Sequence, residues 1–302
     1  MRVSSITVRS PTPGMKHLLC MAAIGWIAVG SSVFAGQTVP LSEDELTRLL
    51  DRRLDGGLGY TFAQFANMFV PNSTIQLPQG VILVAKTKAI DDTELMPVFP
   101  EHYRPRLREL LDAIALQTSS TWAYVTESDS LKSDSKTPVG GIVCIEFSPT
   151  ESRLELSVEI PPGWSVRDVG NRRMCAPPTF PVGIDFYHMG TYSFDGDRAA
   201  GMEKIVKSIA LDWASRVKEG TSENDLGQKR IGAYDALTFE TTIPSRLGMD
   251  LIWRHWVFAA EDRCYFVVST LDQKHLKQQA ADIDAMLDSF KPSRTAPPES
   301  EN

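Results

Sequence analysis

The sequence predicts an α+β protein: an antiparallel sheet covered by helices fills the C-terminal half, after a smaller α+β region. Strand-like runs at 233–243, 249–259 and 263–271 are separated by turns short enough for antiparallel neighbours. Amphipathic helices are predicted on either side of these runs, at 199–217 and 276–290. Both helices must bury an apolar face, so we expect them to cover the sheet as an α/β/α sandwich.

A helix is predicted soon after residue 40. Ser42 and Glu45 have the spacing of a capping box, in which each side chain accepts a hydrogen bond from the other residue's backbone. Leucines then recur at helical spacing up to Leu54, and Gly56-Gly57 favour a helix end there. A loop-like stretch with two prolines follows.

The rest of the N-terminal region alternates short strands with a helix. Apolar runs predict strands at 81–85, 122–125 and 141–147. The spacing of its leucines predicts a helix over 104–118. Residues 128–137 are polar and serine-rich, which is typical of an exposed hairpin loop.

Two more strands are predicted before the long helix. Apolar residues alternate over 154–160, which indicates a half-buried strand that ends at the prolines and glycine of 161–163. A strand is predicted at 182–187, and 171–181, with its three prolines, is expected to be irregular.

The first 35 residues have the anatomy of a secretory signal. A basic start after Met15 is followed by a 13-residue apolar run, Leu18 to Gly30, and by small residues up to Ala35. A membrane-spanning helix needs about 20 residues, so cleavage after Ala35 is favoured over an uncleaved anchor. Translation from Met1 and translation from Met15 both remain open.

Cleavage leaves 267 residues, in which we expect an N-terminal α+β region at 36–150, the sandwich at 151–291 and a disordered tail at 292–302. The signal holds three basic residues and no acidic ones, so its loss moves the net charge from −7 to −10. This charge argues against binding to nucleic acid or to an anionic lipid surface. We expect the mature chain not to insert into a membrane.

Three cysteines remain in the mature chain. An oxidising compartment would allow one disulfide, and Cys144 with Cys175 is the favoured pair. Cys264 shares a strand face with apolar residues and is expected to be a small buried side chain. No flanking motif supports a catalytic cysteine.

No catalytic, cofactor or metal motif is found in the sequence. Neither a Gly-x-Ser-x-Gly elbow nor a phosphate-binding glycine loop occurs. The mature histidines lack the spacing of a helical zinc site; they are His102, His188, His255 and His275. We therefore expect a protein that is not an enzyme and needs no cofactor or metal.

The segment 253–256, Trp-Arg-His-Trp, is the most unusual local cluster. One interpretation is a central strand covered on both faces, with the rings filling the core. The other is a groove in which Arg254 and Trp256 anchor a partner, as aromatic and arginine side chains do at binding hot spots. His188 and Tyr192 could line the same groove, or simply lie at a strand end and its turn.

The C-terminal half resembles the PsbP and DcrB families. The resemblance rests on Ile160-Pro-Pro-Gly-Trp164, on the strand Gly232–Phe239, on the strand Arg263–Thr270 and on the helix end Leu287–Lys291. It covers about half of the mature chain. It implies the α/β/α sandwich and an accessory or partner-binding role, and it offers no catalytic residues to carry over.

Together these observations predict an exported, non-catalytic accessory or binding protein of the bacterial cell envelope. Its location would be periplasmic or secreted, and its partner another protein. One alternative is a periplasmic immunity or inhibitor protein that neutralises a toxin or enzyme, and another is an enzyme of unrecognised class. A deep pocket with convergent polar groups would favour the enzyme, and an aromatic groove would favour binding.

Overall fold

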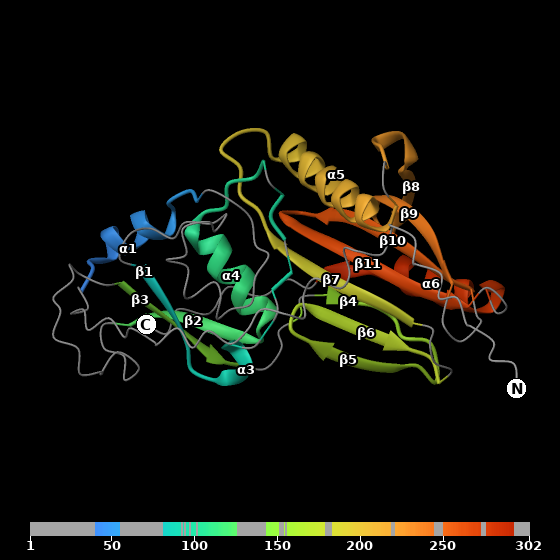
Figure 1. Cartoon of the computed structure of the whole chain (residues 1–302), viewed down its shortest axis with the longest axis horizontal. Helices are drawn as coiled ribbons and strands as arrows, with labels where there is room; N and C mark the ends of the chain where they lie inside the picture. Colours follow the sequence, from blue (N-terminus) through green and yellow to red (C-terminus); the bar gives the residue numbers. More distant parts are fainter. Residues whose placement is uncertain are drawn as a thin grey trace, which may run out of the picture.

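The computed structural model describes residues 40–54, 81–100 apart from 92, 94 and 97, 102–125, 143–150, 154, 156–178, 183–218, 221–244, 250–272 and 276–292. The signal segment 1–35, the loop 128–137 and all of the tail except Pro292 lie outside these residues. The predicted α+β fold class is confirmed. The strands form a large antiparallel sheet, a three-stranded sheet and a short two-stranded pair (Figure 1).

The C-terminal lobe is built on a seven-stranded antiparallel sheet with the order β5-β6-β7-β11-β10-β9-β8. The three hairpin-connected strands predicted from the sequence are its central and neighbouring members β9, β10 and β11. The strands are β5 (Ser165–Val169), β6 (Arg172–Ala176), β7 (Gly183–Thr191), β8 (Gly227–Ile231), β9 (Tyr234–Pro244), β10 (Asp250–Ala260) and β11 (Arg263–Asp272).

Two helices cover the opposite faces of this sheet, as a sandwich requires. Helix α5 (Arg198–Val217) is capped by Asp197, whose carboxylate accepts from the backbone N–H groups of Ala199 and Ala200. Its buried stripe packs with alternate residues of β10 and β11, among them Val257 and Phe266. Helix α6 (Leu276–Asp288) packs on the other face of the sheet, against the residues of β10 and β11 that alternate with those under α5. A short 3-10 turn, Glu223–Asp225, precedes β8.

The N-terminal lobe is a three-stranded sheet with the order β1-β3-β2. Strands β1 (Val81–Ala85) and β3 (Val143–Pro149) are parallel, whereas β2 (Ser120–Val125) runs antiparallel to β3. Helix α1 (Glu43–Leu50) carries the predicted capping box in full. The remaining helices of this lobe are α3 (Lys88–Asp91) and α4 (Leu107–Gln117).

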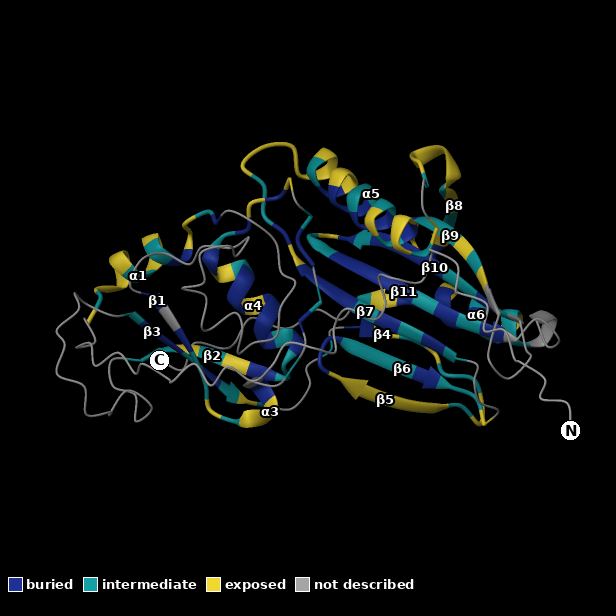
Figure 2. Cartoon of the chain, in the orientation of Figure 1, coloured by how far each residue is buried: buried dark blue, intermediate teal, exposed yellow. Residues whose placement is uncertain are grey.

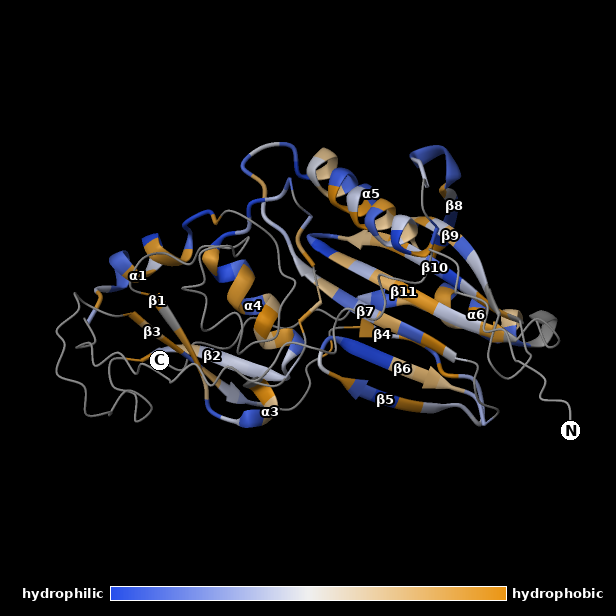
Figure 3. Ribbon diagram, viewed as in Figure 1, coloured by the Kyte–Doolittle hydropathy of each residue, from blue (hydrophilic) through white to orange (hydrophobic). Residues whose placement is uncertain are grey.

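Helix α4 lies between the two sheets, and most of its residues are buried (Figures 1 and 2). Figure 3 shows apolar and polar residues alternating in bands along it. It begins at Leu107, three residues later than predicted, because Arg106 is the extended N-cap residue that follows Pro105. The backbone N–H of Arg106 donates to Glu109 Oε2 at 2.7 Å, which fixes this start.

The predictions of a strand over 154–160 and of irregular structure over 171–181 were wrong. Among the described residues of 154–160, only β4 (Leu156–Ser157) forms, and it pairs with the equally short β12 (Lys291–Pro292). The alternation instead reflects one-sided burial, since Leu154, Val158 and Ile160 pack on the core under α6. The region 171–181, expected to be irregular, contains β6.

Strands β5 and β8 were not predicted either. All five residues of β5 are exposed, and β8 is mostly polar, so neither shows the apolar run or alternation that marks a buried strand (Figure 2). Both lie at the edges of the sheet, where burial is weakest.

One hydrophobic core is continuous across the two lobes. It joins α4 residues such as Leu110 and Ile114, and Phe147 of β3, to Met189 and Phe266 of the large sheet. The predicted boundary near residue 150 therefore separates two sheets that share a core. None of the helices in the described part of the chain is long and apolar enough to cross a membrane.

Candidate functional site

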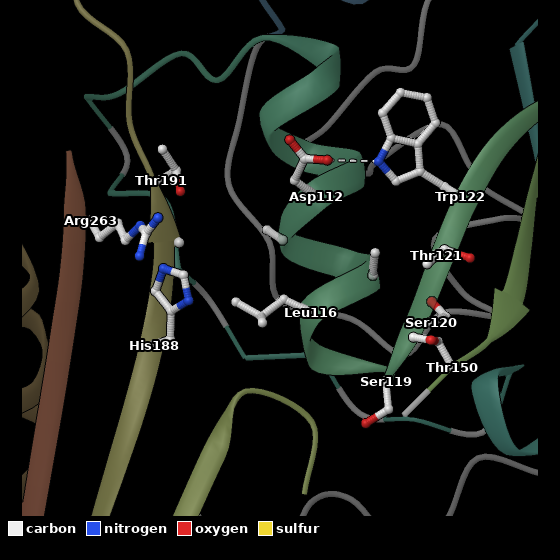
Figure 4. A pocket seen from close by; sticks show the side chains of 13 residues that line it. Asp112, Leu116, Ser119, Ser120, Thr121, Trp122, Thr150, His188, Thr191 and Arg263 are labelled. Carbon is white, nitrogen blue, oxygen red and sulfur yellow. Dashed lines mark hydrogen bonds between the residues drawn. The ribbon is translucent and has the colours of Figure 1, made fainter. Parts of the chain in front are cut away.

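A cleft of about 460 Å³ lies between the two lobes, beside α4. In Figure 4, the side chains from β7 and β11 stand on one side of it and those from β2 on the other, with α4 between them. We call this the interlobe cleft. It is lined by Asp112, Ala113, Ala115, Leu116, Ser119, Ser120, Thr121, Trp122, Thr150, His188, Gly190, Thr191 and Arg263.

The turn after α4 positions the floor of the cleft. Ser119 adopts a positive φ of 49°, and its hydroxyl accepts from the Gly170 backbone N–H at 3.1 Å. Gly170, at φ 57°, closes the β5–β6 turn, and a Cβ there would come within 2.3 Å of the Gln117 carbonyl oxygen. Only glycine fits this contact, so the turn of the large sheet is held against the end of α4.

His188 is placed by an irregularity in the β7–β11 ladder. Residue 189 is bulged out of the pairing, since His188 pairs with Tyr265 and Gly190 pairs with Cys264. The Asn171 side chain donates to the His188 carbonyl at 3.0 Å, and the His188 N–H donates to the Asn171 carbonyl at 2.9 Å. The imidazole stacks on the ring of Tyr265, with the centroids 5.2 Å apart.

The imidazole of His188 is neutral in this setting. The side chain is 4% exposed, and neither ring nitrogen has a hydrogen-bond partner. Burial, together with the positive charge of Arg263, lowers the pKa of His188 to about 3. Arg263 is therefore the cationic group on this side of the cleft.

Asp112 and Trp122 form a pair on the opposite side. Trp122 Nε1 donates to Asp112 Oδ1 at 2.7 Å, which ties β2 to α4 (Figure 4). Desolvation by the surrounding atoms raises the pKa of Asp112, although its side chain is accessible to solvent and the indole bond acts in the opposite direction. The pair presents a carboxylate and an aromatic ring to the cleft.

The lining of the cleft contains both donors and acceptors of hydrogen bonds. Five hydroxyl side chains can donate and accept, the guanidinium only donates and the carboxylate only accepts. Such convergent polar groups in a concave site suit the binding of a polar ligand or segment. Within the described residues, no three His, Cys, Asp or Glu side chains gather as a metal site would require.

At the N-terminal end of α4 the lobes are joined directly, through a set of contacts that we call the interlobe latch. Glu109 accepts from the Ser193 N–H at 2.8 Å, from the Ser193 hydroxyl and from the Tyr103 hydroxyl at 2.9 Å. Arg53 and Arg106 both donate to the carboxylate of Asp195, at 2.9 and 2.8 Å. This network spans residues of both lobes.

The structure places Tyr192 beside the interlobe latch rather than in a binding groove. Its hydroxyl donates to the Val98 carbonyl at 2.5 Å, and its ring meets Phe99 and Tyr103 edge-on. The side chain is 2% exposed. Tyr192 therefore does not line a partner groove. It lies just after the end of β7, as the other interpretation expected, and its ring is buried against the N-terminal lobe.

The predicted groove at Arg254 and Trp256 is not formed either. Trp256 is 2% exposed, since β10 is a central strand with helices over both of its faces. Its ring packs under α6, with the Lys229 ammonium 5.7 Å from its centroid. Arg254 is half-buried and pairs with Glu240 at 2.7 Å. The core-filling interpretation of this segment is the one that the structure matches.

The predicted disulfide between Cys144 and Cys175 was also wrong. Cys144 lies in β3 of the small sheet and Cys175 in β6 of the large sheet, and both are free and buried. Cys264 is a fully buried thiol, as expected. Burial raises the pKa of the Cys175 thiol to about 12.

Of the predicted site residues, the cleft contains only His188. No sequence motif pointed to Asp112, Trp122 or Arg263 as site residues, since they come from three separate elements. A polar residue such as Asp112 on an amphipathic helix is a weak signal, because exposed positions of such helices usually carry polar residues.

Comparison with known proteins gives distant likenesses only. No family model matches the chain, and no curated protein matches it. A solved protein of Bacteroides thetaiotaomicron VPI-5482 is similar at 10% identity and a TM-score of 0.33, over 46% of each chain. LpqN, involved in cell envelope biogenesis of Mycobacterium tuberculosis, is similar at 8% identity and a TM-score of 0.30, over 46% of this chain and 83% of LpqN.

The match thus spans less than half the length of the Bacteroides protein. Both likenesses are partial and sheet-rich, and the resemblance to the PsbP and DcrB families stays a prediction. The fold and the cleft define an α+β protein of two joined lobes with a polar cleft between them.

Proposed function

We propose that this chain is an exported, non-catalytic accessory protein of the bacterial cell envelope, which acts by binding another protein in its interlobe cleft. The observation that carries the proposal is the cleft itself: a concave, polar surface at the junction of two lobes, where binding sites preferentially occur. The signal-like segment supports export, with cleavage after Ala35.

Convergent polar groups are the feature that would favour an enzyme, but the arrangement of these groups supports binding rather than catalysis. Nucleophilic catalysis by serine or threonine needs a hydroxyl within hydrogen-bond reach of a base. His188 is the one imidazole in the cleft lining, and both of its nitrogens lack partners and are inaccessible to water. The hydroxyls are left to serve as donors and acceptors for a bound segment.

Affinity capture with two matched variants tests the proposal. Thr121 and Ala123 are both exposed on β2 and share a strand face, but only Thr121 lines the cleft. Thr121→Arg should therefore abolish capture of a stoichiometric partner from the periplasm, whereas Ala123→Arg should retain it. Equal capture by both variants would overturn a role for the cleft.

The same experiment separates the alternatives. A captured toxin or enzyme whose activity falls in the complex would identify an inhibitor. Turnover of a substrate by the purified mature chain would identify an enzyme instead. A partner that is bound without loss of activity agrees with the accessory role proposed here.

A further inference from the structure

Asp112 and Trp122 place a carboxylate beside an aromatic ring in the interlobe cleft (Figure 4). The indole Nε1 donates to Asp112 Oδ1 at 2.7 Å, so the second carboxylate oxygen, Oδ2, keeps its capacity to accept. Asp112 is exposed, whereas Trp122 is half-buried, since it packs partly against the core and partly borders the cleft. Both side chains are therefore accessible from the cleft.

Elsewhere in the described part of the molecule, a carboxylate and an aromatic ring together hold a cation. In four places an Arg or Lys side chain pairs with a carboxylate at 2.5–2.9 Å and also lies over a ring, 5.3–5.8 Å from its centroid. These sets are Arg53 with Asp195 and Tyr103, Arg172 with Asp185 and Tyr187, Arg216 with Asp212 and Trp213, and Lys229 with Asp284 and Trp256. The carboxylate attracts the cation, and the negative face of the ring adds to this attraction.

The pair of Asp112 and Trp122 differs from these four sets in its surroundings. Within the described residues, no cation lies over the Trp122 ring and none forms an ion pair with Asp112. Desolvation is the largest influence on the pKa of Asp112 and raises it, whereas the bond from Trp122 lowers it. The charges of Arg108 and Glu109, both on α4, then act in opposite directions, and Arg263 across the cleft is not among the causes of the shift.

The environment of this carboxylate favours a cation from outside the chain. A charge that is partly removed from water pairs more strongly with an approaching cation than a fully hydrated charge does. The ring beside the carboxylate is the second element that the four internal sets share. The charge and the ring on this side of the cleft therefore complement a basic side chain of a bound protein.

We propose that the interlobe cleft recognises an arginine side chain of the partner protein, which pairs with Asp112 Oδ2 and lies over the Trp122 ring. Arginine is favoured over lysine because its planar guanidinium stacks on an indole and carries further donors for the hydroxyl groups of the lining. Three of the four internal sets also use arginine. This inference rests on the proposed function, because it names the group of the partner that the cleft selects.

The probe is N-acetyl-arginine amide, titrated into the ¹⁵N-labelled mature chain. The indole N–H signal of Trp122 reports on binding and should shift until the site is saturated. N-acetyl-citrulline amide has nearly the same shape but no charge, so it should bind about tenfold more weakly. In the arginine complex, nuclear Overhauser contacts should join the side-chain methylene protons of the probe to the protons of the Trp122 ring.

Two matched variants test the role of the carboxylate. Asp112→Asn keeps an oxygen that can accept from the indole but loses the charge, so it should remove the difference between the two probes. Asp212→Asn is the control, since Asp212 lies beside the ring of Trp213 outside the cleft lining and already pairs with Arg216. This variant should preserve the difference.

Several results would overturn the inference. They are equal binding of the arginine and citrulline probes, an unchanged preference in Asp112→Asn, and a saturated complex without contacts to the Trp122 ring. Tighter binding of N-acetyl-glutamate amide would mean that the cleft selects an acidic group instead. A Trp122 signal that moves with protein concentration alone would mean that a second copy of the chain occupies the cleft.

The capture experiment keeps this inference separate from the proposed function. If capture of another protein depends on Thr121 but is the same with Asp112→Asn, the proposed function survives and the arginine assignment fails. If capture does not depend on Thr121 while the arginine probe binds as predicted, the proposed function fails and the cation site remains.

Discussion

The two ends of α4 join the lobes in different ways. At its N-terminal end, Glu109 is bonded to Tyr103 and Ser193, and Tyr192 is buried among aromatic rings. Further along, Asp112 and Leu116 border an open, polar cleft. The latch holds the lobes together with satisfied contacts, while the cleft keeps donors and acceptors accessible between them. The difference assigns stability to one end of the helix and binding to the other.

The largest effect on the latch should come from removing the Tyr192 ring. Tyr192→Ala should lower the free energy of unfolding by about 3–5 kcal/mol, as for other buried aromatic residues. Tyr192→Phe keeps the ring and loses only the bond to Val98, so it should cost about 1 kcal/mol. Urea unfolding measures both, and similar costs for the two variants would contradict a joint held mainly by ring packing.

Acid should lower the free energy of unfolding through two buried histidines, His188 and His255. Burial lowers the pKa of His188 to about 3 and that of His255 to about 4, so both are neutral in the folded chain. The unfolded chain takes up protons below about pH 6.5, so stability should fall as the pH drops from there toward 4. Each histidine contributes a slope of up to about 1.4 kcal/mol per pH unit.

His188→Phe tests this slope with unfolding curves at pH 7 and pH 5. The variant should lose less stability between these values than the unmodified chain does. His102→Gln is the control: His102 is exposed, and partial burial and the nearby Lys204 also lower its pKa, so this variant should reduce the slope less than His188→Phe does. An unaltered slope in His188→Phe would mean that this imidazole is not held neutral by burial.

A smaller effect is expected from the central carboxylate of the latch. Glu109→Gln retains one acceptor but loses its charge, and should cost about 1–2 kcal/mol in urea unfolding. The cleft variant Thr121→Arg should leave the unfolding midpoint unchanged. If Thr121→Arg destabilised the chain as much as Glu109→Gln does, this would contradict the assignment of stability to the latch and of binding to the cleft.

The smallest effect should come from Asp195→Asn. Asp195 is exposed and its two arginine partners are partly accessible to water, so solvent and salt screen the pairs. The unfolding midpoint should barely change, and any change should vanish at high salt. A clear loss of stability that persists in 1 M salt would mean that the ion pairs of Asp195 contribute much of the stability of the latch.

Sequence patterns predicted the elements that have a strong local signal. The capping box of α1, the stripe of α5 and the three hairpin-connected strands followed from spacing alone. The edge strand β5 did not, because its exposed residues carry no burial pattern. The Trp253–Trp256 segment drew attention through its composition, yet a central strand buries such rings.

The cleft could not be predicted for a different reason. Its walls come from α4, β2, β7 and β11, so its chemistry depends on how two sheets pack rather than on any local motif. His188 was predicted either to line a groove with Arg254 and Trp256 or to lie at a strand end. The bulge at residue 189 that places it depends on the pairing of β7 with β11. Sites made by such packing leave no spacing in the sequence.

Site-specific photo-cross-linking in the periplasm tests the central claim most directly. Benzoylphenylalanine at Thr121, in the cleft, should give a single adduct with one partner protein, and the same group at Ala123 should give little. Val166 and Val169, the exposed apolar residues of β5, provide a second control outside the cleft. Adducts at β5 with none at Thr121 would contradict the account, because the partner would then bind away from the cleft.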